Sequence, residues 1–261
     1  MLWIRCECVE QVRAGRRSRV GRVEAELLRW YDRTRRDLPW RRTNDPYAIL
    51  VSEVMLQQTQ VERVVGRYAE WLERWPTAES LAAASPADVI RAWQGLGYNR
   101  RALALHRAAR VVAESGWPED LTALPGVGAY TAAAIRNFAF GEPVLPVDVN
   151  VARVQERTEF AFSPAAAQAL MDLGARVCLA RVPRCGECPL AATCPSRGRR
   201  YEPARRQGRF EGSFRQRRAE LLRRVAARPC SSREVDPEVV GSLLRDGLVT
   251  LDGGMLMLPE V

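Results

Sequence analysis

The chain has 261 residues, with 40 basic and 31 acidic side chains, one histidine and a formal net charge of +9. Apolar residues make up 47% of the chain and charged residues 27%, a composition that is typical of folded globular proteins and excludes a largely disordered chain. No apolar stretch is long enough to span a bilayer, and residues 1–20 lack the apolar core of a signal peptide. We therefore expect a cytoplasmic protein with no membrane segment, and the positive charge indicates a polyanionic partner.

All 40 basic residues are arginine, so the sequence contains no lysine. No side-chain amine is therefore available to form a Schiff base with a substrate. In a cytoplasmic protein, the seven cysteines are expected to be metal ligands or free thiols, since disulfides are rare in that compartment.

Helical spacing of apolar residues predicts a first helix over residues 21–37, a series of short helices over 46–143 and a further helix over 164–180. The C-terminal part predicts two amphipathic helices, over 214–228 and 236–245. A β-hairpin with its turn at Asp252-Gly253-Gly254 is predicted to follow them. Two helices followed by a hairpin are similar to a small winged-helix module, which either contacts DNA or serves as a packing appendage.

Four cysteines follow the helix at 164–180 with the spacing C-x6-C-x2-C-x5-C, namely Cys178, Cys185, Cys188 and Cys194. Four thiolates within so short a loop favour one metal centre, either an iron–sulfur cluster or zinc. The remaining cysteines, Cys6, Cys8 and Cys230, have no partner at metal-ligand spacing.

Three further features contain candidate functional residues. Leu124-Pro125-Gly126-Val127-Gly128 predicts a tight turn before a helix, whose backbone N–H groups can bind a phosphate. Asp148 follows a proline-rich apolar loop. It is either a functional carboxylate, partly desolvated by the apolar neighbours Val144, Leu145, Val147 and Val149, or a helix N-cap. Glu53 lies on a helix with apolar residues on all sides, so we expect either an ion pair with an arginine or a raised pKa.

These segments carry a resemblance to a known family. GVGAYTAAAIRNFAFGEPVLPVDVNVARV and the cysteine spacing resemble the helix–hairpin–helix superfamily of endonuclease III, and SEVMLQQTQV resembles its adenine-glycosylase branch. LPWR at 38–41, GLGY at 95–98 and MDLG at 171–174 are also similar to that branch. The resemblance spans residues 21–200. It implies an all-α, two-lobed DNA glycosylase fold with an iron–sulfur cluster loop, here followed by the winged-helix-like module.

The resemblance also implies roles for particular residues. Asp148 would stabilise the positive charge on the sugar with help from Asn150, and Glu53 would protonate the departing purine and then help to activate water. Tyr130 occupies the position at which lyase members carry a catalytic lysine. The residues expected to contact the base or the DNA are Trp40, Arg41, Gln58, Tyr98, Gly126, Val127 and Gly128. The four loop cysteines would hold one [4Fe–4S] cluster, while His106 would be a structural helix residue.

The expected organisation is a basic tail over 1–20, a glycosylase core over 21–200, a linker over 201–213 and the module over 214–261. Within the core, a six-helix lobe spans about 44–145. A cluster lobe combines 21–43 with 146–200, and the active site is expected in the cleft between the two lobes.

The predicted function is hydrolysis of the N-glycosidic bond of adenine mispaired with guanine or 8-oxoguanine, without lyase activity. The substrate would be mismatched or damaged double-stranded DNA, bound by a nucleoid-associated monomer. About sixty residues follow the cysteines, too few for the 8-oxoguanine-recognition domain of long-form relatives, and Val149 replaces a usual small residue. Two alternatives stay open: a thymine or uracil glycosylase acting opposite guanine, and a non-catalytic iron–sulfur protein that binds DNA or senses redox state.

Overall fold

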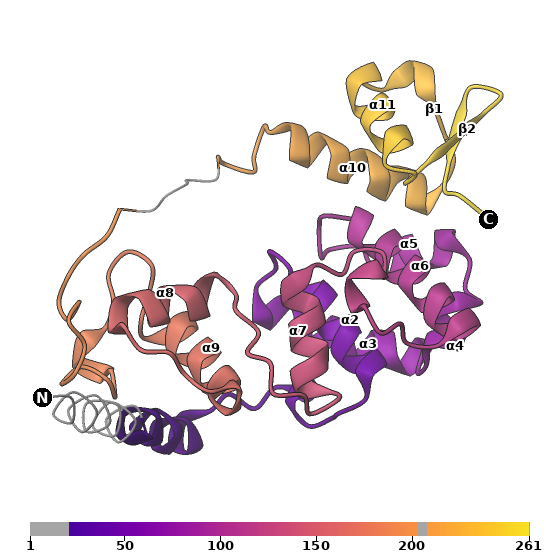
Figure 1. Ribbon diagram of the computed structural model, residues 1–261. Coiled ribbons are helices and arrows are strands. Elements are labelled where there is room, and N and C mark those ends of the chain that lie inside the picture. Colours follow the sequence, from indigo (N-terminus) through magenta and orange to yellow (C-terminus); the bar gives the residue numbers. More distant parts are fainter. Residues whose placement is uncertain (1–20, 203–207, 261) are drawn as a thin grey trace, which may run out of the picture. The chain divides into compact units, whose positions relative to one another are not determined.

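The computed structural model describes residues 21–202 and 208–260, which are mostly helical (Figure 1). The chain divides into two compact units, each made of two separate stretches of sequence. The first, the α8–α9 unit, contains Met1–Asp37 and Gly141–Arg206. The second, the α2–α7 unit, contains Leu38–Phe140 and Gln207–Val261. The basic tail predicted over 1–20 lies outside the described residues.

The series of short helices predicted over 46–143 is confirmed. Its elements are η1 (Pro39–Arg41), α2 (Pro46–Leu56), α3 (Val61–Arg74), α4 (Ala78–Ala82), α5 (Pro86–Ala92), α6 (Arg100–Ser115), η2 (Leu121–Ala123) and α7 (Ala129–Phe138). Local chemistry determines several of the boundaries. Thr77 and Ser80 form a reciprocal capping box at the start of α4, and the Ser85 side chain accepts a hydrogen bond from the amide of Asp88 in α5. Gly116, at φ +74°, ends α6.

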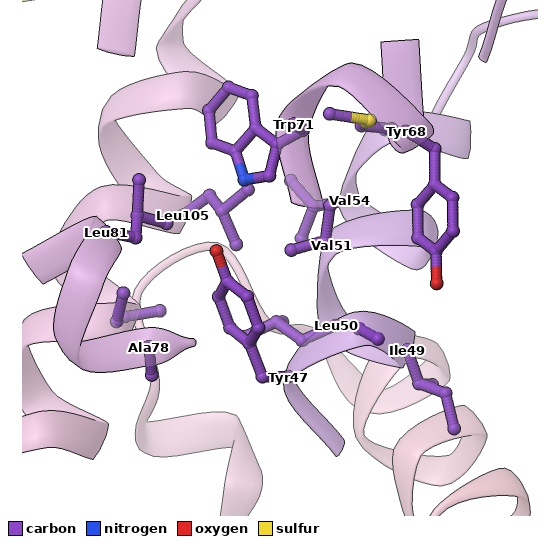
Figure 2. Packing of buried hydrophobic residues seen from close by; sticks show 14 of the residues in the cluster. Tyr47, Ile49, Leu50, Val51, Val54, Tyr68, Trp71, Ala78, Leu81 and Leu105 are labelled. Atoms are coloured by element: carbon purple, nitrogen blue, oxygen red, sulfur yellow. The ribbon is translucent and has the colours of Figure 1, made fainter. Parts of the chain in front are cut away.

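Helix α2 is the centre of this unit, because every residue from Tyr47 to Met55 is buried. A helix that is apolar on all sides can be stable only when other helices surround it. Figure 2 shows the packing around it, with Tyr47 and Val51 of α2 directed toward Trp71 of α3. The Tyr47 hydroxyl donates a hydrogen bond to the carbonyl oxygen of Trp75 at 3.0 Å, which satisfies a polar group inside this core.

The C-terminal module is also part of the α2–α7 unit. It consists of α10 (Phe214–Ala227), β1 (Cys230–Ser231), η5 (Ser232–Glu234), α11 (Pro237–Arg245), β2 (Thr250–Asp252) and β3 (Met255–Met257). The two predicted helices and the hairpin are therefore confirmed. Strand β1 was not predicted, since two residues are too few to show alternation. It pairs with β3 to give an antiparallel sheet of order β1-β3-β2.

The module packs on α5 and α6 through an apolar cluster. Ile90 and Leu103 of those helices share this cluster with Leu222 and Leu256 of the module. A hydrogen bond from Arg91 Nε to the carbonyl oxygen of Ala226, at 3.3 Å, also joins α5 to α10. The module and the six helices therefore share buried apolar surface.

The α8–α9 unit begins with a helix whose described part covers residues 21–34. Its other elements are α8 (Val149–Thr158), η3 (Pro164–Ala166), α9 (Ala167–Arg176) and η4 (Cys185–Glu187). The helix predicted over 164–180 thus starts as a 3-10 turn and ends before the first cysteine of the loop. Leu27 of the first helix, Val154 of α8 and Leu170 of α9 lie in one apolar core.

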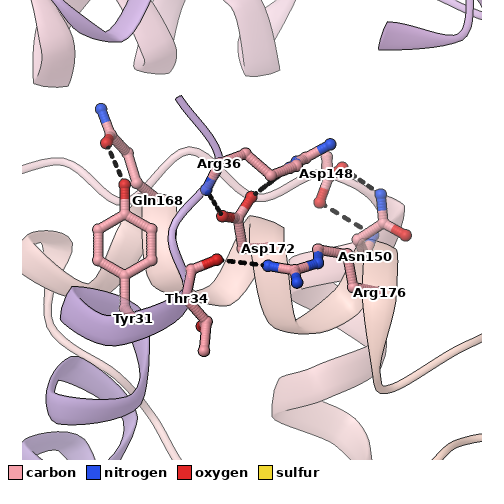
Figure 3. Close-up of polar contacts among 8 residues, drawn as sticks. All are labelled: Tyr31, Thr34, Arg36, Asp148, Asn150, Gln168, Asp172 and Arg176. Carbon is pink, nitrogen blue, oxygen red and sulfur yellow. Dashed lines mark hydrogen bonds and ion pairs between the residues drawn. The ribbon is translucent and has the colours of Figure 1, made fainter. Parts of the chain in front are cut away.

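The segment after the first helix is bound to α9 by a buried ion pair (Figure 3). Asp172 is fully buried and accepts hydrogen bonds from the backbone N–H and from Nε of Arg36, at 3.1 and 2.8 Å. Arg176 also donates to the carbonyl oxygen of Thr34 at 2.6 Å.

None of the helices among the described residues is both long enough and apolar enough to cross a membrane.

Candidate active site and cysteine loop

Asp148 is the N-cap residue of α8. Its Oδ1 accepts hydrogen bonds from the backbone N–H groups of Asn150 and Val151 at 2.9 and 2.7 Å. Its Oδ2 accepts a third from the side-chain amide of Asn150 at 2.8 Å (Figure 3). The structural interpretation of Asp148 as a helix cap is therefore correct. It is compatible with a catalytic role, because three donors fix the orientation of a half-buried carboxylate that keeps lone pairs for a ligand.

A second residue holds Asn150 in place. Arg153, one turn further along α8, donates from Nη2 to the side-chain oxygen of Asn150 and to the carbonyl oxygen of Gly174, both at 2.7 Å. Its Nε donates to the carbonyl oxygen of Cys178 at 2.8 Å. A continuous series of hydrogen bonds therefore runs from the carboxylate of Asp148 to the first cysteine of the loop.

The two valines beside Asp148 are more exposed to solvent than expected. Val147 is 47% exposed and Val149 is 78% exposed, so within this unit their side chains do not bury the carboxylate. The α8 backbone and Asn150 surround it instead. This outcome follows from N-cap geometry, which turns the capping side chain back over the first turn of the helix while its neighbours point outward.

Gly174 allows α9 to approach α8 closely at this position. A Cβ atom added to Gly174 would lie 2.7 Å from the Cβ of Asn150 and 3.1 Å from its carbonyl oxygen. Any side chain here would push directly on the residue that orients Asp148.

Glu53 belongs to the other unit and lies in the buried part of α2, with 6% of its surface exposed. The expected burial of this carboxylate on a largely apolar helix is confirmed. The neighbouring Ser52 is buried as well, and its hydroxyl donates to the carbonyl oxygen of Ile49 at 2.8 Å. A buried ionisable group within an apolar helix is costly for the fold, and such groups concentrate at functional sites.

The predicted phosphate-binding turn connects η2 to α7. Gly126 adopts φ +80°, and a Cβ there would lie 2.8 Å from the Cβ of Ala104, so this turn requires glycine. Gly128 is the N-cap of α7 and offers no capping side chain, while Val127 is buried and anchors the turn. The first-turn N–H groups of α7, including that of the half-buried Tyr130, form the end of a helix dipole that favours an anion.

Gln58 and Tyr98, the two residues expected to enter the DNA stack, share an unusual backbone conformation. Gln58 has φ +56° and Tyr98 has φ +46°, in the left-handed region that few non-glycine residues adopt. Both side chains are exposed, and 44% of the Tyr98 surface is accessible. Tyr98 is therefore not part of the apolar core of this unit.

The other predicted residues have different surroundings. Trp40 is buried in the core of the α2–α7 unit, with its ring edge-on to Tyr68 at 5.5 Å, and Arg41 beside it is half-buried. His106 is buried in α6, and burial lowers its pKa. The prediction of His106 as a structural helix residue agrees with this position.

The four cysteines of the loop line one pocket, together with Val154, Arg157, Thr158, Leu173, Val177, Pro183, Arg184, Ala191, Ser196 and Arg197. Among the described residues, no three histidine, cysteine or acidic side chains converge closely enough to hold a metal ion as they stand. The donor set nevertheless suits a metal centre, because four cysteines line a single pocket and thiolates are strong ligands for iron and zinc. Burial, to which the other three thiols add, raises the pKa of Cys188 to about 11.

Arg157 supports this pocket from α8. Its Nη1 lies 3.5 Å from Sγ of Cys178, and its backbone carbonyl accepts from the thiol of Cys194 at 3.4 Å. Its guanidinium also donates to the carbonyl oxygen of Leu179 at 2.8 Å and lies over the ring of Tyr201 at 3.7 Å. A positive charge and an apolar wall around four thiols are suitable surroundings for an anionic thiolate-ligated group.

Sequence reasoning did not identify Arg101, Arg153 and Arg157, which the structure shows bound to backbone carbonyls around these sites. Arg153 could have been noticed because it lies three residues after Asn150, on the same face of a helix. Arg101 gives no such signal among 40 arginines.

Comparison with known proteins identifies the family of this chain. The family model of the HhH-GPD superfamily base excision DNA repair proteins matches residues 51–174. The adenine DNA glycosylase of Mycolicibacterium smegmatis is 43% identical to this chain, with 90% of this chain and 96% of that protein covered. The human adenine DNA glycosylase is 40% identical, with 70% of this chain and 40% of that protein covered.

Solved structures share the fold. A thermostable thymine-DNA glycosylase matches with a TM-score of 0.62 at 27% identity, covering 69% of this chain and 96% of that one. An endonuclease III–DNA covalent intermediate matches with a TM-score of 0.59 at 21% identity, covering 68% of this chain and 95% of that one. The predicted helical glycosylase fold is thus confirmed, and the chain belongs to the adenine DNA glycosylase family of the HhH-GPD superfamily of base excision repair proteins.

Proposed function

We propose that this base excision repair glycosylase hydrolyses the N-glycosidic bond of adenine mispaired with guanine or 8-oxoguanine and leaves the DNA strand uncut. The observation that carries the proposal is the carboxylate of Asp148, which three donors orient at the start of α8 in a chain of this family. A fixed negative charge of this kind stabilises a developing sugar cation without reorganising during the reaction.

Glu53 and Asp148 have complementary tasks on the same extrahelical nucleotide. Glu53 donates a proton to the adenine ring as the bond between C1′ and the base nitrogen breaks, and the bonding electrons leave with the base. Asp148 stabilises the positive charge that remains on the sugar. Water then adds to C1′ and gives its proton to the Glu53 carboxylate, which restores the starting protonation state.

The absence of lysine supports hydrolysis alone. A lyase step would require an amine that attacks C1′, and Tyr130 occupies the position where lyase members carry that lysine. We expect borohydride to trap no covalent complex between enzyme and DNA through a side chain.

DNA binding is proposed to use the turn at Gly126, Val127 and Gly128 as a phosphate site, with Gln58 and Tyr98 entering the base stack. Trp40 and Arg41 stay proposed members of the base-contacting region. The net charge of +9 adds a favourable electrostatic contribution that does not depend on sequence.

Asp148→Asn and Glu53→Gln test this mechanism by single-turnover excision from a duplex with adenine opposite 8-oxoguanine. Each change keeps the side-chain size, and each should slow excision by about a hundredfold or more while leaving affinity for the duplex nearly unchanged. A purine whose ring already carries positive charge should partly rescue Glu53→Gln and leave Asp148→Asn slow. Glu73→Gln on the exposed side of α3 is the matched control and should excise at the normal rate. Normal excision by Glu53→Gln would contradict the proton-donor role.

We also propose that Cys178, Cys185, Cys188 and Cys194 hold one [4Fe–4S] cluster. Such a cluster, when bound, ties the loop into a single unit through four thiolate bonds. The support is the shared pocket of the four thiols and the positive charge of Arg157 beside Cys178.

Iron and acid-labile sulfide analysis after anaerobic purification tests the cluster. We expect about four of each per chain, as one cubane requires. Cys188→Ser should reduce both, while Cys230→Ser, a buried cysteine of β1 outside the loop, should reduce neither. Stoichiometric zinc without iron would contradict the proposal.

A further inference from the structure

Arg101, the second residue of α6, binds the end of α2. Its Nη1 lies 2.8 Å from the carbonyl oxygen of Val54, 3.1 Å from that of Met55 and 2.5 Å from that of Gln57. The last carbonyls of a helix have no partner within the helix, so a guanidinium at this position serves as their C-terminal cap.

The other side of the same guanidinium binds a second loop. Nη2 donates to the carbonyl oxygen of Gly97 at 2.9 Å and to the hydroxyl of Thr59 at 3.0 Å. Nε donates to the carbonyl oxygen of Tyr98 at 3.3 Å. The Thr59 hydroxyl also donates to the carbonyl oxygen of Leu96 at 3.3 Å, so the loops 57–59 and 96–98 are joined both through Arg101 and directly.

Two of the carbonyls that accept from the guanidinium, those of Gln57 and Gly97, immediately precede the two left-handed residues. The carbonyl of Gln57 belongs to the peptide group whose nitrogen is that of Gln58, and the carbonyl of Gly97 belongs to the peptide group that leads into Tyr98. Drawing both carbonyls inward toward one cation restricts the rotation of these peptide groups. Non-glycine residues in the left-handed region are strained, and they persist only where their surroundings determine them.

The setting of Arg101 makes these contacts strong. Burial lowers the pKa of Arg101 to about 10, so the side chain is still a cation at neutral pH. Its guanidinium lies 5.3 Å from the ring centre of Trp93 and 5.5 Å from that of Tyr98. A charge-assisted hydrogen bond in such a partly desolvated site is stronger than the same bond in water.

We propose that Arg101 is a positioning residue that presets Gln58 and Tyr98 in the conformation in which they enter the DNA stack as the target nucleotide leaves it. The inference rests on the proposed function of these two side chains. Arg101 itself acts through their backbones, and its contribution is to remove the cost of ordering two loops at the moment of base flipping.

The test measures base flipping apart from excision. The target adenine is replaced by 2-aminopurine, which becomes fluorescent when it leaves the stack, in a duplex opposite 8-oxoguanine. Asp148→Asn protein is used throughout so that base release is slow compared with the fluorescence measurement. R101Q should lower the fluorescence gain of the saturated complex about fivefold, and the Q58A/Y98A double variant should lower it by at least as much.

The decisive comparison is R101Q added to Q58A/Y98A. If Arg101 acts through these side chains, the added change should lower the fluorescence gain by less than about twofold, because the groups that it positions are already gone. R101K keeps the charge but cannot span both loops with one ammonium, so it should resemble R101Q. R100Q removes the adjacent charge, whose side chain is 75% exposed, and should flip normally.

Two results would overturn the inference. In the first, R101Q lowers the fluorescence gain by the same factor whether Gln58 and Tyr98 are present or replaced. Arg101 would then support the structure in general, and the proposed adenine hydrolysis would still stand. In the second, the Q58A/Y98A variant flips the base normally. Neither side chain would then be needed for base flipping, and Arg101 could not act through them. Adenine release by the protein without substitutions is measured separately. If that protein releases adenine, the proposed function stands even where the inference about Arg101 fails.

Discussion

At the scale of single residues, Asp148 is a helix cap, and the proposed catalytic role uses the same carboxylate. The cap fixes its position through the amides of Asn150 and Val151, and Arg153 fixes Asn150 in turn. If Asp148 is catalytic as proposed, adenine excision should depend on residues that need not contact the substrate.

Gly174→Ala tests this dependence. The added methyl group would meet Asn150 Cβ at 2.7 Å, so α9 or the start of α8 must shift. We expect adenine excision to slow about tenfold or more, since small displacements of a catalytic group are costly, and we expect duplex affinity to stay within about twofold. Single-turnover kinetics and a binding titration measure the two effects.

Gly66→Ala is the matched control, because Gly66 is also in a helix interior but has nothing within 4 Å of an added Cβ. It should keep full activity and gain up to about 1 kcal/mol of stability from helix propensity. Equal activity of the two variants would show that the contact of Gly174 with Asn150 does not position Asp148.

Sequence patterns reveal some of these residues and not others. Glu53 could be predicted to be buried because apolar residues occur on every side of its helix. Arg101 could not be found, because an arginine that binds carbonyls has the same flanking pattern as one on the surface. The exposure of Val149 was not foreseen either, since it depends on the geometry of the cap and not on hydrophobicity.

At the scale of elements, the contact between the first helix and α9 depends on a buried ion pair. Asp172 is fully buried and receives three contacts from Arg36, whose own side chain is 26% exposed. Asp172→Asn keeps the size but places an amide donor against the guanidinium. We expect the free energy of unfolding to fall by about 2–3 kcal/mol. This is at the lower end of the loss for a broken buried ion pair, because the Arg36 side chain is partly exposed to solvent.

Urea unfolding measures this loss, and Glu70→Gln supplies the comparison. The pair of Arg67 and Glu70 is exposed on α3, so its loss should change stability by less than about 0.5 kcal/mol. An Asp172→Asn protein as stable as Glu70→Gln would mean that the buried pair adds nothing to the packing of the first helix.

The boundaries of elements were predictable where local chemistry sets them. The serine before α5, the proline at its first position and the glycine after α6 are such cases. Strand β1 was not, because it exists only through its pairing with β3. Long-range pairing of a two-residue strand leaves no periodic signal in the sequence.

At the scale of the whole molecule, the C-terminal module packs as part of the α2–α7 unit. Leu222 of α10 is fully buried in the cluster that includes Ile90 and Leu103. Leu222→Ala should therefore cost about 2–5 kcal/mol and should loosen α5 and α6 as well as the module.

Hydrogen exchange followed by mass spectrometry detects where the loosening occurs. Peptides from α5 and α6 should exchange faster in Leu222→Ala, together with those from the module. Leu251→Ala makes the same change at a leucine that is 49% exposed on β2, and it should leave both regions unchanged. Faster exchange confined to residues 214–258 would show that the module is energetically independent of the six helices.

The central claim is that this protein releases adenine by hydrolysis, and product analysis on a set of duplexes tests it most directly. The duplexes carry A·8-oxoG, A·G, T·G and U·G pairs, and the assay records the released base, the integrity of the strand and borohydride trapping. We expect free adenine from the first two duplexes, an abasic strand that breaks only with alkali or heat, and no trapped adduct through a side chain. Release of thymine or uracil in preference to adenine, or strand cleavage without alkali, would contradict it.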